Sequence, residues 1–461
     1  LTTMLMTFML ALTGYQAALA RNNSYPGGKY YMYRLFLTDK NGADFSLSHP
    51  EQFLSKKALE RRRRQHIEVD STDLPQPALY LKQIEGMGGH VVSKSKWNNT
   101  VLVKVNDRHT AEQLTDLPFV NRMLKVWESP DTFIPNRRDN IQKTLGEKEH
   151  HPGSYYGAAE LQITMLGGKA LHDAGYKGRG MTIAVLDGGF MNADRIPTLA
   201  KVKILGTHDC VPTPSTGSVY GEHDHGTKVL SCMAANEPDY IVGTAPEAAY
   251  WLIRAEDVYT ETLAEEDYWA AAAEFADSVG VDVVNSSLGY QDFDGNEGDH
   301  TYRELDGHTA LISCSASMMA AKGMVLCNSA GNDGMGTWKK IGVPADADDI
   351  LAVGAVNSMR KNAAFSSVGP SADGRVKPDV MALGSPAAVI NGRGAISHDM
   401  GTSFASPIMA GMVACLWQSR PELTAKELIQ LVRQCGHQYD YPDNIFGYGI
   451  PDFTLEVRGK R

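Results

Sequence analysis

The sequence predicts a large α/β domain built on a parallel sheet with helices on both faces, preceded by a small α+β domain. The chain has 461 residues, which suits more than one domain. From about residue 154 onward, short continuous apolar runs alternate with helical patterns, as parallel strands buried on both faces require. In the first third, shorter strands and helices alternate within the span of one small domain.

The composition is that of a globular protein. Hydrophobic residues make up 43% of the chain and charged residues 21%, and the formal net charge is -10. A negative chain of this kind is a poor ligand for nucleic acid, so no nucleic-acid partner is expected. Six cysteines are present, and their pairing is left open; Cys232, Cys327 and Cys415 lie in apolar runs typical of buried free thiols.

The first twenty residues differ from the rest. Residues 1–20 are apolar and end in Ala18-Leu19-Ala20, the small-x-small pattern that precedes a signal-peptide cleavage site. We expect residues 1–20 to be a signal peptide; an uncleaved membrane anchor is the alternative. No membrane contact is expected beyond this segment.

Residues 21–128 are predicted to form the small α+β domain. Ser48-His49-Pro50-Glu51 has the form of a capping box and is expected to open a helix that runs to about residue 65. The run Arg61 to Arg64 is interpreted as the solvated end of that helix rather than a processing site. The other expected elements are strands at residues 29–38 and 119–127, helices at 77–87 and 108–117, and two strands within 89–106 that turn at Asn98-Asn99.

Residues 129–153 lose all periodicity. Pro130, Pro135, Arg137-Arg138 and a charged stretch predict an exposed linker. Proteases cut such linkers preferentially, so we expect a maturation site within it.

Residues 154–461 are predicted to form the large domain. Its expected strands lie at residues 181–186, 249–254, 281–286, 323–327 and 350–356, and its expected helices at 225–235, 265–278 and 408–417. The Met318-Met319 pair, Trp251 and Trp269 are interpreted as core residues.

Four polar residues occupy the positions where such domains carry their chemistry. Asp187 and Asn332 each follow a strand, and His225 and Ser403 each open a helix. Taken alone, each has a structural interpretation as a turn residue, a cap or a packed histidine. Together they supply an orienting carboxylate, a general base, an oxyanion donor and a nucleophile, and so predict serine-type hydrolysis.

The motifs around these residues resemble those of the subtilisin-like serine proteases, or subtilases. The order of acid, histidine and serine is that of the subtilisin arrangement. The resemblance covers residues 154–449 and rests on Asp187-Gly188-Gly189, His225-Gly226-Thr227, Ser287-Leu288-Gly289, Ala330-Gly331-Asn332 and Gly401-Thr402-Ser403-Phe404-Ala405-Ser406-Pro407. Two residues depart from the family pattern: Gly188 stands for the usual Ser or Thr, and Lys228 for a frequent His.

The resemblance implies roles for further residues. It makes Asp187, His225 and Ser403 the triad and Asn332 the side-chain oxyanion donor. It implies that Ser287, Leu288 and Gly289 pair with an extended substrate, and that Asn328, Ser329, Ala330 and Gly331 wall the first specificity pocket. The N-terminal domain resembles a ferredoxin-like subtilase propeptide, which assists folding and inhibits the enzyme. The layout resembles exported subtilases of Bacteroidetes-type bacteria, secreted or held in the cell envelope.

The expected partners are polypeptide substrates and the chain's own propeptide, and the expected state is a monomer. No cofactor is required by this chemistry. Subtilases often bind structural calcium, but no family site matches residue by residue, and the acidic stretch Asp292 to Asp299 is interpreted as a solvated loop because its glycine is misplaced for an EF-hand. Two alternatives stay open: a catalytically silent binding protein with this fold, and an esterase.

Overall fold

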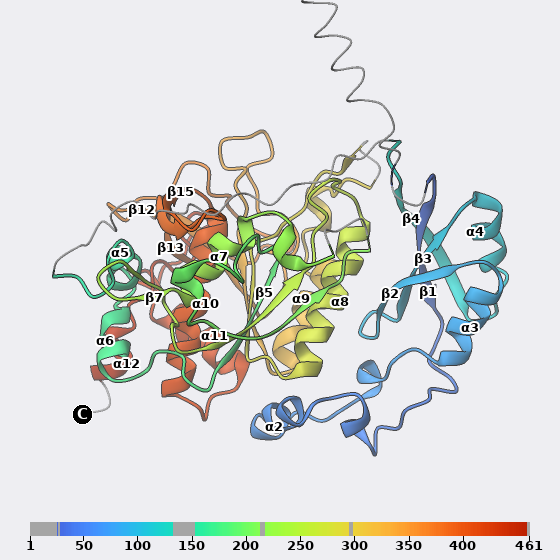
Figure 1. Ribbon diagram of the computed structural model, residues 1–461, viewed down its shortest axis with the longest axis horizontal. Helices are drawn as coiled ribbons and strands as arrows, with labels where there is room; N and C mark the ends of the chain where they lie inside the picture. Colours follow the sequence, from blue (N-terminus) through green and yellow to red (C-terminus); the bar gives the residue numbers. More distant parts are fainter. Residues whose placement is uncertain (1–24, 26–27, 132–152, 213–216, 295–297, 459–461) are drawn as a thin grey trace, which may run out of the picture.

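The computed structural model describes residue 25 and residues 28–131, 153–212, 217–294 and 298–458. Within them the chain forms two units that lie side by side (Figure 1). The expected signal peptide at residues 1–20 and most of the expected linker at 129–153 lie outside the described residues. Among the described residues, no helix combines the length and apolar character needed to cross a membrane.

The small unit is a four-stranded antiparallel sheet of ferredoxin-like order, β2-β3-β1-β4. Its strands are β1 (Tyr31–Leu37), β2 (His90–Ser95), β3 (Thr100–Val105) and β4 (Val120–Glu128), and its crossing helices are α3 (Ala78–Gly86) and α4 (Arg108–Leu114). Alternate residues of β1 face opposite ways: Leu35 packs with Ile84 and Leu114 beneath the helices, whereas Met32 packs toward the large unit. The α+β prediction is confirmed.

The helix expected from Ser48 begins later than predicted. The Ser48 hydroxyl bonds to Ser46 Oγ at 2.7 Å, so no capping box forms, and residues Pro50–Gln52 make only a 3-10 turn. The helix α2 (Lys56–Arg64) starts at Ser55, whose side chain accepts from the Ala58 N–H. Ser55, about two turns downstream, therefore caps the helix in place of the predicted Ser48.

The arginine run is not a fully solvated helix end. Arg61 and Arg62 are 2% and 1% exposed because α2 lies against the large unit. The Arg62 guanidinium pairs with Asp73 of its own unit and with Asp277 of the large unit, both at 2.8 Å. The prediction was wrong for these two residues, since their partner Asp277 is more than 200 residues away in sequence.

The large unit contains a seven-stranded parallel sheet, ordered β13-β12-β11-β10-β5-β9-β6. The five predicted strands are confirmed as β5 (Thr182–Asp187), β9 (Ala249–Arg254), β10 (Val283–Ser286), β11 (Val325–Ser329) and β12 (Leu351–Asn357). The edge strands β6 (Lys203–Asp209) and β13 (Val380–Ser385) were not predicted. No residue of β6 is fully buried, so its sequence lacks the continuous apolar run of a central strand.

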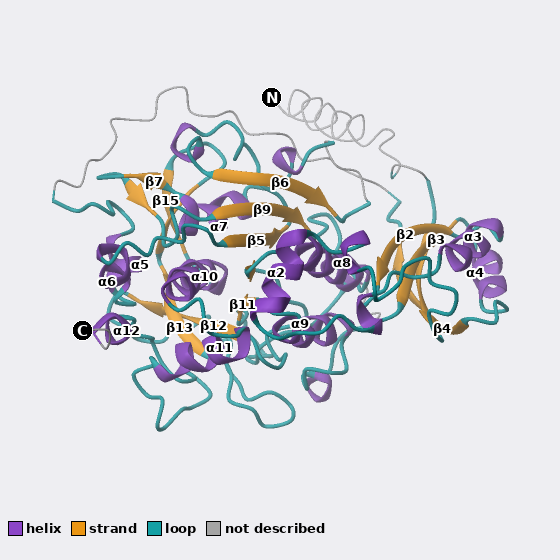
Figure 2. Cartoon of the chain, turned by 90° about the horizontal axis from the view of Figure 1, so that it is seen from below, coloured by secondary structure: helices purple, strands orange, loops and turns teal. Residues whose placement is uncertain are grey.

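Helices cover both faces of this sheet (Figure 2). The helices α7 (His225–Ala234) and α10 (Thr402–Ser419) pack on one face, and α8 (Ala264–Val279) and α9 (Leu311–Ala321) on the other. Trp269 and Met319 are fully buried, and Trp251 and Met318 pack against the same core, as expected. The remaining elements are α5 (Glu160–Thr164), α6 (Gly168–Asp173), β7 (Asn236–Glu237), β8 (Ile241–Val242), β14 (Ala387–Ile390), β15 (Ile396–Asp399), α11 (Ala425–Gln434) and α12 (Thr454–Arg458).

Candidate active site

A buried carboxylate holds a histidine at the carboxyl edge of the sheet. Asp187 is the last residue of β5 and is fully buried, and His225 is the first residue of α7. His225 Nδ1 lies 2.9 Å and 3.0 Å from the two Asp187 carboxylate oxygens. Gly226 permits this approach, because a Cβ there would lie 2.4 Å from the Gly189 carbonyl oxygen. The two predicted residues are therefore brought together by local geometry.

The pairing decides the charge of the imidazole. Burial alone lowers the His225 pKa, but the negative charge of Asp187 and its hydrogen bond outweigh burial and raise the pKa to about 9. A negative neighbour thus stabilises the imidazolium, the form that a general base reaches after taking a proton.

Ser403 is the second residue of α10, one of the longest helices of the large unit. Its hydroxyl donates to the Ser287 carbonyl at 3.5 Å, and the Ser287 hydroxyl donates back to the Ser403 carbonyl at 2.8 Å. Ser403 and His225 line one cavity, although no hydrogen bond joins their side chains among the described residues. Such bonds are often long before substrate arrives.

Asn332 faces the same cavity from the loop after β11. Its Oδ1 accepts from the backbone N–H of Thr402 at 2.9 Å and from the Thr402 hydroxyl at 3.0 Å. Anchoring the oxygen on α10 leaves the Nδ2 protons as the donors that this side chain can offer to the cavity. The Ser403 backbone N–H belongs to the first turn of α10, where N–H groups have no partner within the helix.

The cavity has a volume of about 710 Å³. Six of the seven expected substrate-binding residues line it: Ser287, Leu288, Gly289, Ser329, Ala330 and Gly331. Asn328 lies behind this wall, fully buried, and donates to the carbonyl oxygens of Leu288 and Ser329. Asn328 therefore supports the cavity without lining it.

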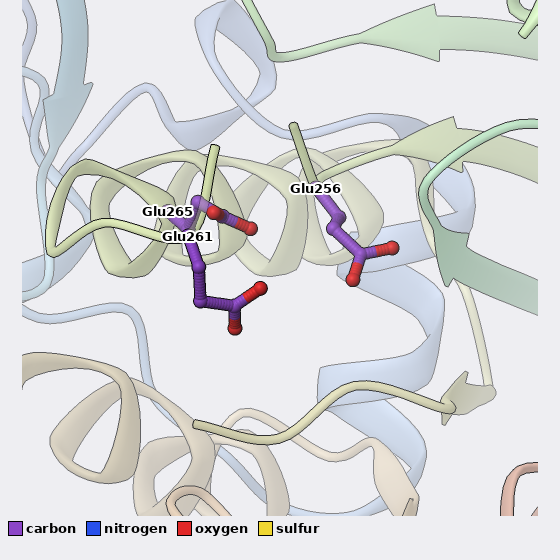
Figure 3. Close-up of side chains that lie close together, drawn as sticks. All are labelled: Glu256, Glu261 and Glu265. Atoms are coloured by element: carbon purple, nitrogen blue, oxygen red, sulfur yellow. The ribbon is translucent and has the colours of Figure 1, made fainter. Parts of the chain in front are cut away.

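Three glutamates beside the cavity were not anticipated. Carboxylate oxygens of Glu256, Glu261 and Glu265 lie within 4.8 Å of one another, close enough to hold a metal ion together (Figure 3). Burial and neighbouring carboxylates raise the pKa of Glu256 to about 8 and that of Glu261 to about 7. All three follow the carboxyl end of β9, the same sheet edge as Asp187, and that position was the available signal.

The two departures from the family pattern have local explanations. A Cβ at residue 188 would lie 2.5 Å from Glu256 Oε2 and 2.6 Å from Val258 Cγ1, so glycine makes room for Glu256. Lys228 pairs with Asp399 at 2.9 Å and with Asp224 at 3.6 Å, and so faces carboxylates rather than the nucleophile.

All six cysteines are free thiols, and Cys232, Cys327, Cys415 and Cys435 are buried. Burial of the thiols raises the pKa of each of these cysteines. The expectation that Cys232, Cys327 and Cys415 are buried free thiols is confirmed.

Comparisons with known proteins agree with the fold and the motifs. The model of the Subtilase family matches residues 178–449, and that of the Bacteroidota peptidase S8 propeptide domain matches residues 32–143. Subtilisin NAT of Bacillus subtilis subsp. natto is 30% identical over 306 residues, which cover 66% of this chain and 72% of that protein. Subtilisin of Bacillus pumilus is 31% identical over 265 residues, 57% of this chain and 86% of that protein.

The crystal structure of the epidermin leader peptide processing serine protease from Staphylococcus aureus shares the fold, with a TM-score of 0.61 at 17% identity. The alignment covers 94% of this chain and 99% of that one. The family match spans more than half of the chain and includes all the motifs at the cavity. The chain therefore belongs to the subtilase family of serine endopeptidases and carries a propeptide unit of the Bacteroidota type.

Proposed function

We propose that Ser403, His225 and Asp187 form the catalytic triad of this peptidase, with Asn332 as the oxyanion donor. The observation that carries the proposal is the Asp187–His225 hydrogen bond at the rim of a cavity that Ser403 and Asn332 also line. The four residues come from four segments of the chain, and hydrogen bonds to backbone atoms hold these segments in place.

The reaction runs through an acyl-enzyme. Ser403 Oγ attacks the scissile carbonyl carbon while His225 Nε2 takes the hydroxyl proton, and the tetrahedral oxyanion accepts from the Ser403 N–H and Asn332 Nδ2. The imidazolium gives its proton to the leaving amine nitrogen as the C–N bond breaks. Water then attacks the acyl-enzyme by the same route, and the acid product and Ser403 are released.

Asp187 acts on His225 rather than on the substrate. Accepting from Nδ1–H fixes the tautomer with Nε2 facing the cavity, and the carboxylate charge stabilises the imidazolium. Because Asp187 is fully buried, this charge is little screened by solvent.

We further propose that the protein is exported and matures by cutting itself. Residues 1–20 would be removed as a signal peptide, and a bond within 129–153 would be cut to separate the propeptide unit, residues 21–128, from the catalytic unit, residues 154–461. The match to a Bacteroidota propeptide domain supports this sequence of events. So does the end of β4: a second hollow lined by Trp127 and Glu128 shares Asp294 with the main cavity, so the propeptide chain leads to the rim of the cleft.

A serine-directed fluorophosphonate tests the triad. Wild-type protein should be labelled and Ser403→Ala should not, whereas Ser358→Ala, a change at an exposed serine of the same unit, should be labelled normally. Purified Ser403→Ala precursor should also stay at full length, and N-terminal sequencing of the wild type should locate the cut within 129–153.

The same experiment separates the alternatives. A silent binding protein would not be labelled in any form. An esterase would be labelled but would turn over esters and not the matched amides. Labelling that persists in Ser403→Ala would remove this serine from the proposed role.

A further inference from the structure

The catalytic cavity is strongly acidic on the side away from the triad. Beyond His225 and Ser403 its lining includes five carboxylates, and none of its lining residues is a lysine or an arginine. The five are Glu256, Asp257, Glu261, Asp294 and Asp333. Because the proposed substrate is a polypeptide that binds in this cavity, the carboxylates would affect which substrate side chains bind there.

The acidic lining continues into an adjoining hollow of about 310 Å³. Its lining is Glu261, Gly289, Gln291, Asp292, Phe293, Asp294 and Asp333. Gly289 lies on the wall expected to pair with substrate, and Asp333 directly follows Asn332 in the chain. A substrate side chain that leaves the main cavity beside Gly289 would therefore enter a space bounded mainly by carboxylates.

Four of these carboxylates have no lysine or arginine as an ion-pair partner in the part of the chain that the structure describes. Among the described residues, no lysine or arginine forms an ion pair with Glu256, Glu261, Asp294 or Asp333, although other buried acids of this chain are paired. Burial comes first and mutual repulsion second in raising the pKa of Glu261 and of Asp333. A cation that arrives with the ligand would favour the ionised form of such partly desolvated carboxyl groups and would bind to it.

We infer that this acidic hollow selects polypeptide substrates that carry a lysine or arginine side chain close to the scissile bond. The inference rests on the proposed triad, because the hollow matters only if Ser403 is the nucleophile. Glu256, Glu261 and Glu265 lie close enough together for a metal ion, but Asp294 and Asp333 extend the acidic lining along two connected hollows, which suits a long basic side chain. Glu265, the most buried of the three clustered glutamates, already accepts from the Tyr290 hydroxyl at 3.1 Å and from the Thr262 N–H at 3.2 Å.

The test uses mature protein obtained from the full chain and fluorogenic peptides in matched sets. At each position from four before to two after the scissile bond, the peptides carry lysine, arginine, glutamine, norleucine or glutamate. At one or more positions, kcat/KM for lysine or arginine should exceed that for glutamine by about 10-fold at low salt, and glutamate should be the poorest. The preference should shrink as salt is raised.

Two variants connect the preference to the hollow. Glu261→Gln and Asp294→Asn keep the shapes of the side chains and remove one charge each, and each should lower the lysine-to-glutamine ratio several-fold. Asp440→Asn, at an exposed aspartate outside the cavity lining, should leave the ratio unchanged. If either variant fails to fold, the lysine-to-glutamine ratio of Asp333→Asn and the salt dependence of that ratio in the wild type test the inference instead.

Three outcomes would overturn the inference. One is equal kcat/KM for lysine and glutamine at every position. Another is a lysine preference that survives both charge-removing variants. The third is a calcium ion bound with unit stoichiometry that abolishes the preference and is lost in Glu261→Gln. If the wild-type protein were not labelled by the fluorophosphonate, the proposed triad would be contradicted instead. Failure of the proposed triad and failure of the inferred substrate preference are therefore distinguishable.

Discussion

At the scale of single residues, the proposed triad implies that the pairing of Asp187 with His225 sets the pH dependence of activity. The His225 pKa is about 9 in the folded protein, above the ordinary value of 6.5. Catalysis needs the neutral imidazole, so kcat/KM should rise with pH through the neutral range, reach half its maximum near pH 9 and level off above that pH. The sign for stability is opposite: the ion pair stabilises the fold fully below about pH 6.5, and that stabilisation is lost as pH rises through about 9.

Asp187→Asn checks this assignment. Without the carboxylate the His225 pKa should fall, so the acidic limb of the pH profile should move to lower pH while kcat drops by about 10⁴-fold. The measurement is kcat/KM from pH 5 to 10 for wild type, Asp187→Asn and the control Asp440→Asn. If the acidic limb of the pH profile did not move in Asp187→Asn, the titration of a group other than His225 would determine the activity of the wild type at low pH.

Asn332 combines an anchor and a donor in one amide, and two variants separate them. Asn332→Asp keeps the oxygen that accepts from Thr402 but removes the donor, whereas Asn332→Ala removes both. Both should lower kcat by about 10²–10³-fold, the usual cost of one oxyanion donor. The midpoint temperature of thermal unfolding should fall more in Asn332→Ala than in Asn332→Asp, because only Asn332→Ala loses the oxygen that accepts from Thr402. Wild-type turnover in Asn332→Asp would exclude the donor role.

Gly188 lies against Glu256, and because glycine has no side chain it leaves space for the Glu256 carboxylate. Gly188→Ser places a Cβ 2.5 Å from Glu256 Oε2 and 2.6 Å from Val258 Cγ1, and overpacking of this kind costs about 1–3 kcal/mol. In the Glu256→Ala background the same change should cost less, because the carboxylate is gone. Urea unfolding of the four proteins of this double-mutant cycle measures the coupling; additive effects would mean that the two residues do not interact.

The four residues of the proposed catalytic set could be selected from sequence because each stands at the end of a strand, in the loop after a strand or at the start of a helix. Local patterns report such positions well. Glu256, Glu261 and Asp294 lie in loops whose paths depend on the rest of the fold, so nothing local brings them to one cavity. The same difference explains Asn328, which lies in β11 beside the cavity wall but faces the interior.

At the scale of elements, burial on both faces made the central strands predictable. β5 and β9 contain continuous apolar runs, every residue of β10 is buried, and the bounds of all three strands lie within about two residues of those expected. β6 lies at the sheet edge with its residues half-exposed, and the start of α2 depends on which serine finds a backbone N–H. Neither feature leaves a clear periodic signal.

At Gly411 in the helix α10, close packing and intrinsic helix propensity favour different residues. Gly411→Ala would raise helix propensity by about 1 kcal/mol, but a Cβ there would meet Thr244 Oγ1 and lie 2.8 Å from Thr244 Cβ. The clash should outweigh propensity and destabilise the protein by about 1–3 kcal/mol. Gly86→Ala, at a helical glycine with no atom within 4 Å, should be neutral or stabilising. Stabilisation by Gly411→Ala in thermal unfolding of the Ser403→Ala precursor would contradict this packing.

At the scale of the whole molecule, the two units meet through buried charge. Arg34 of β1 pairs with Asp267 of α8 at 2.7 Å. The Glu274 carboxylate, also on α8, accepts from the backbone N–H groups of Lys96 and Trp97 at the turn between β2 and β3. Runs of charged residues in a sequence usually indicate solvent-exposed surface, so the arginines of α2 did not predict this interface. Their burial follows only from the long-range docking of the units.

Asp277 is the centre of that interface and supports the last prediction. It pairs with Arg61 and Arg62 and lies 3.6 Å from Lys96, and all four side chains are nearly inaccessible to solvent. Burial alone would raise the Asp277 pKa, but the two arginines outweigh it and hold the pKa below its ordinary value. The stabilisation from this carboxylate is therefore complete above about pH 4 and is lost as pH falls through the lower folded pKa.

Asp277→Ala in the uncut Ser403→Ala precursor removes the carboxylate that pairs with the buried Arg61 and leaves the buried Arg62 paired with Asp73. Removing one member of a buried ion pair costs about 3–5 kcal/mol, so urea unfolding should begin with release of the propeptide unit at a clearly lower concentration. Asp173→Ala, which breaks the exposed pair with Lys169, should cost less than about 1 kcal/mol. Adding Arg61→Met and Arg62→Leu to Asp277→Ala should recover part of the loss, because the uncompensated charges are then gone. Equal unfolding of Asp277→Ala and Asp173→Ala would mean that buried charge does not hold the propeptide on the enzyme.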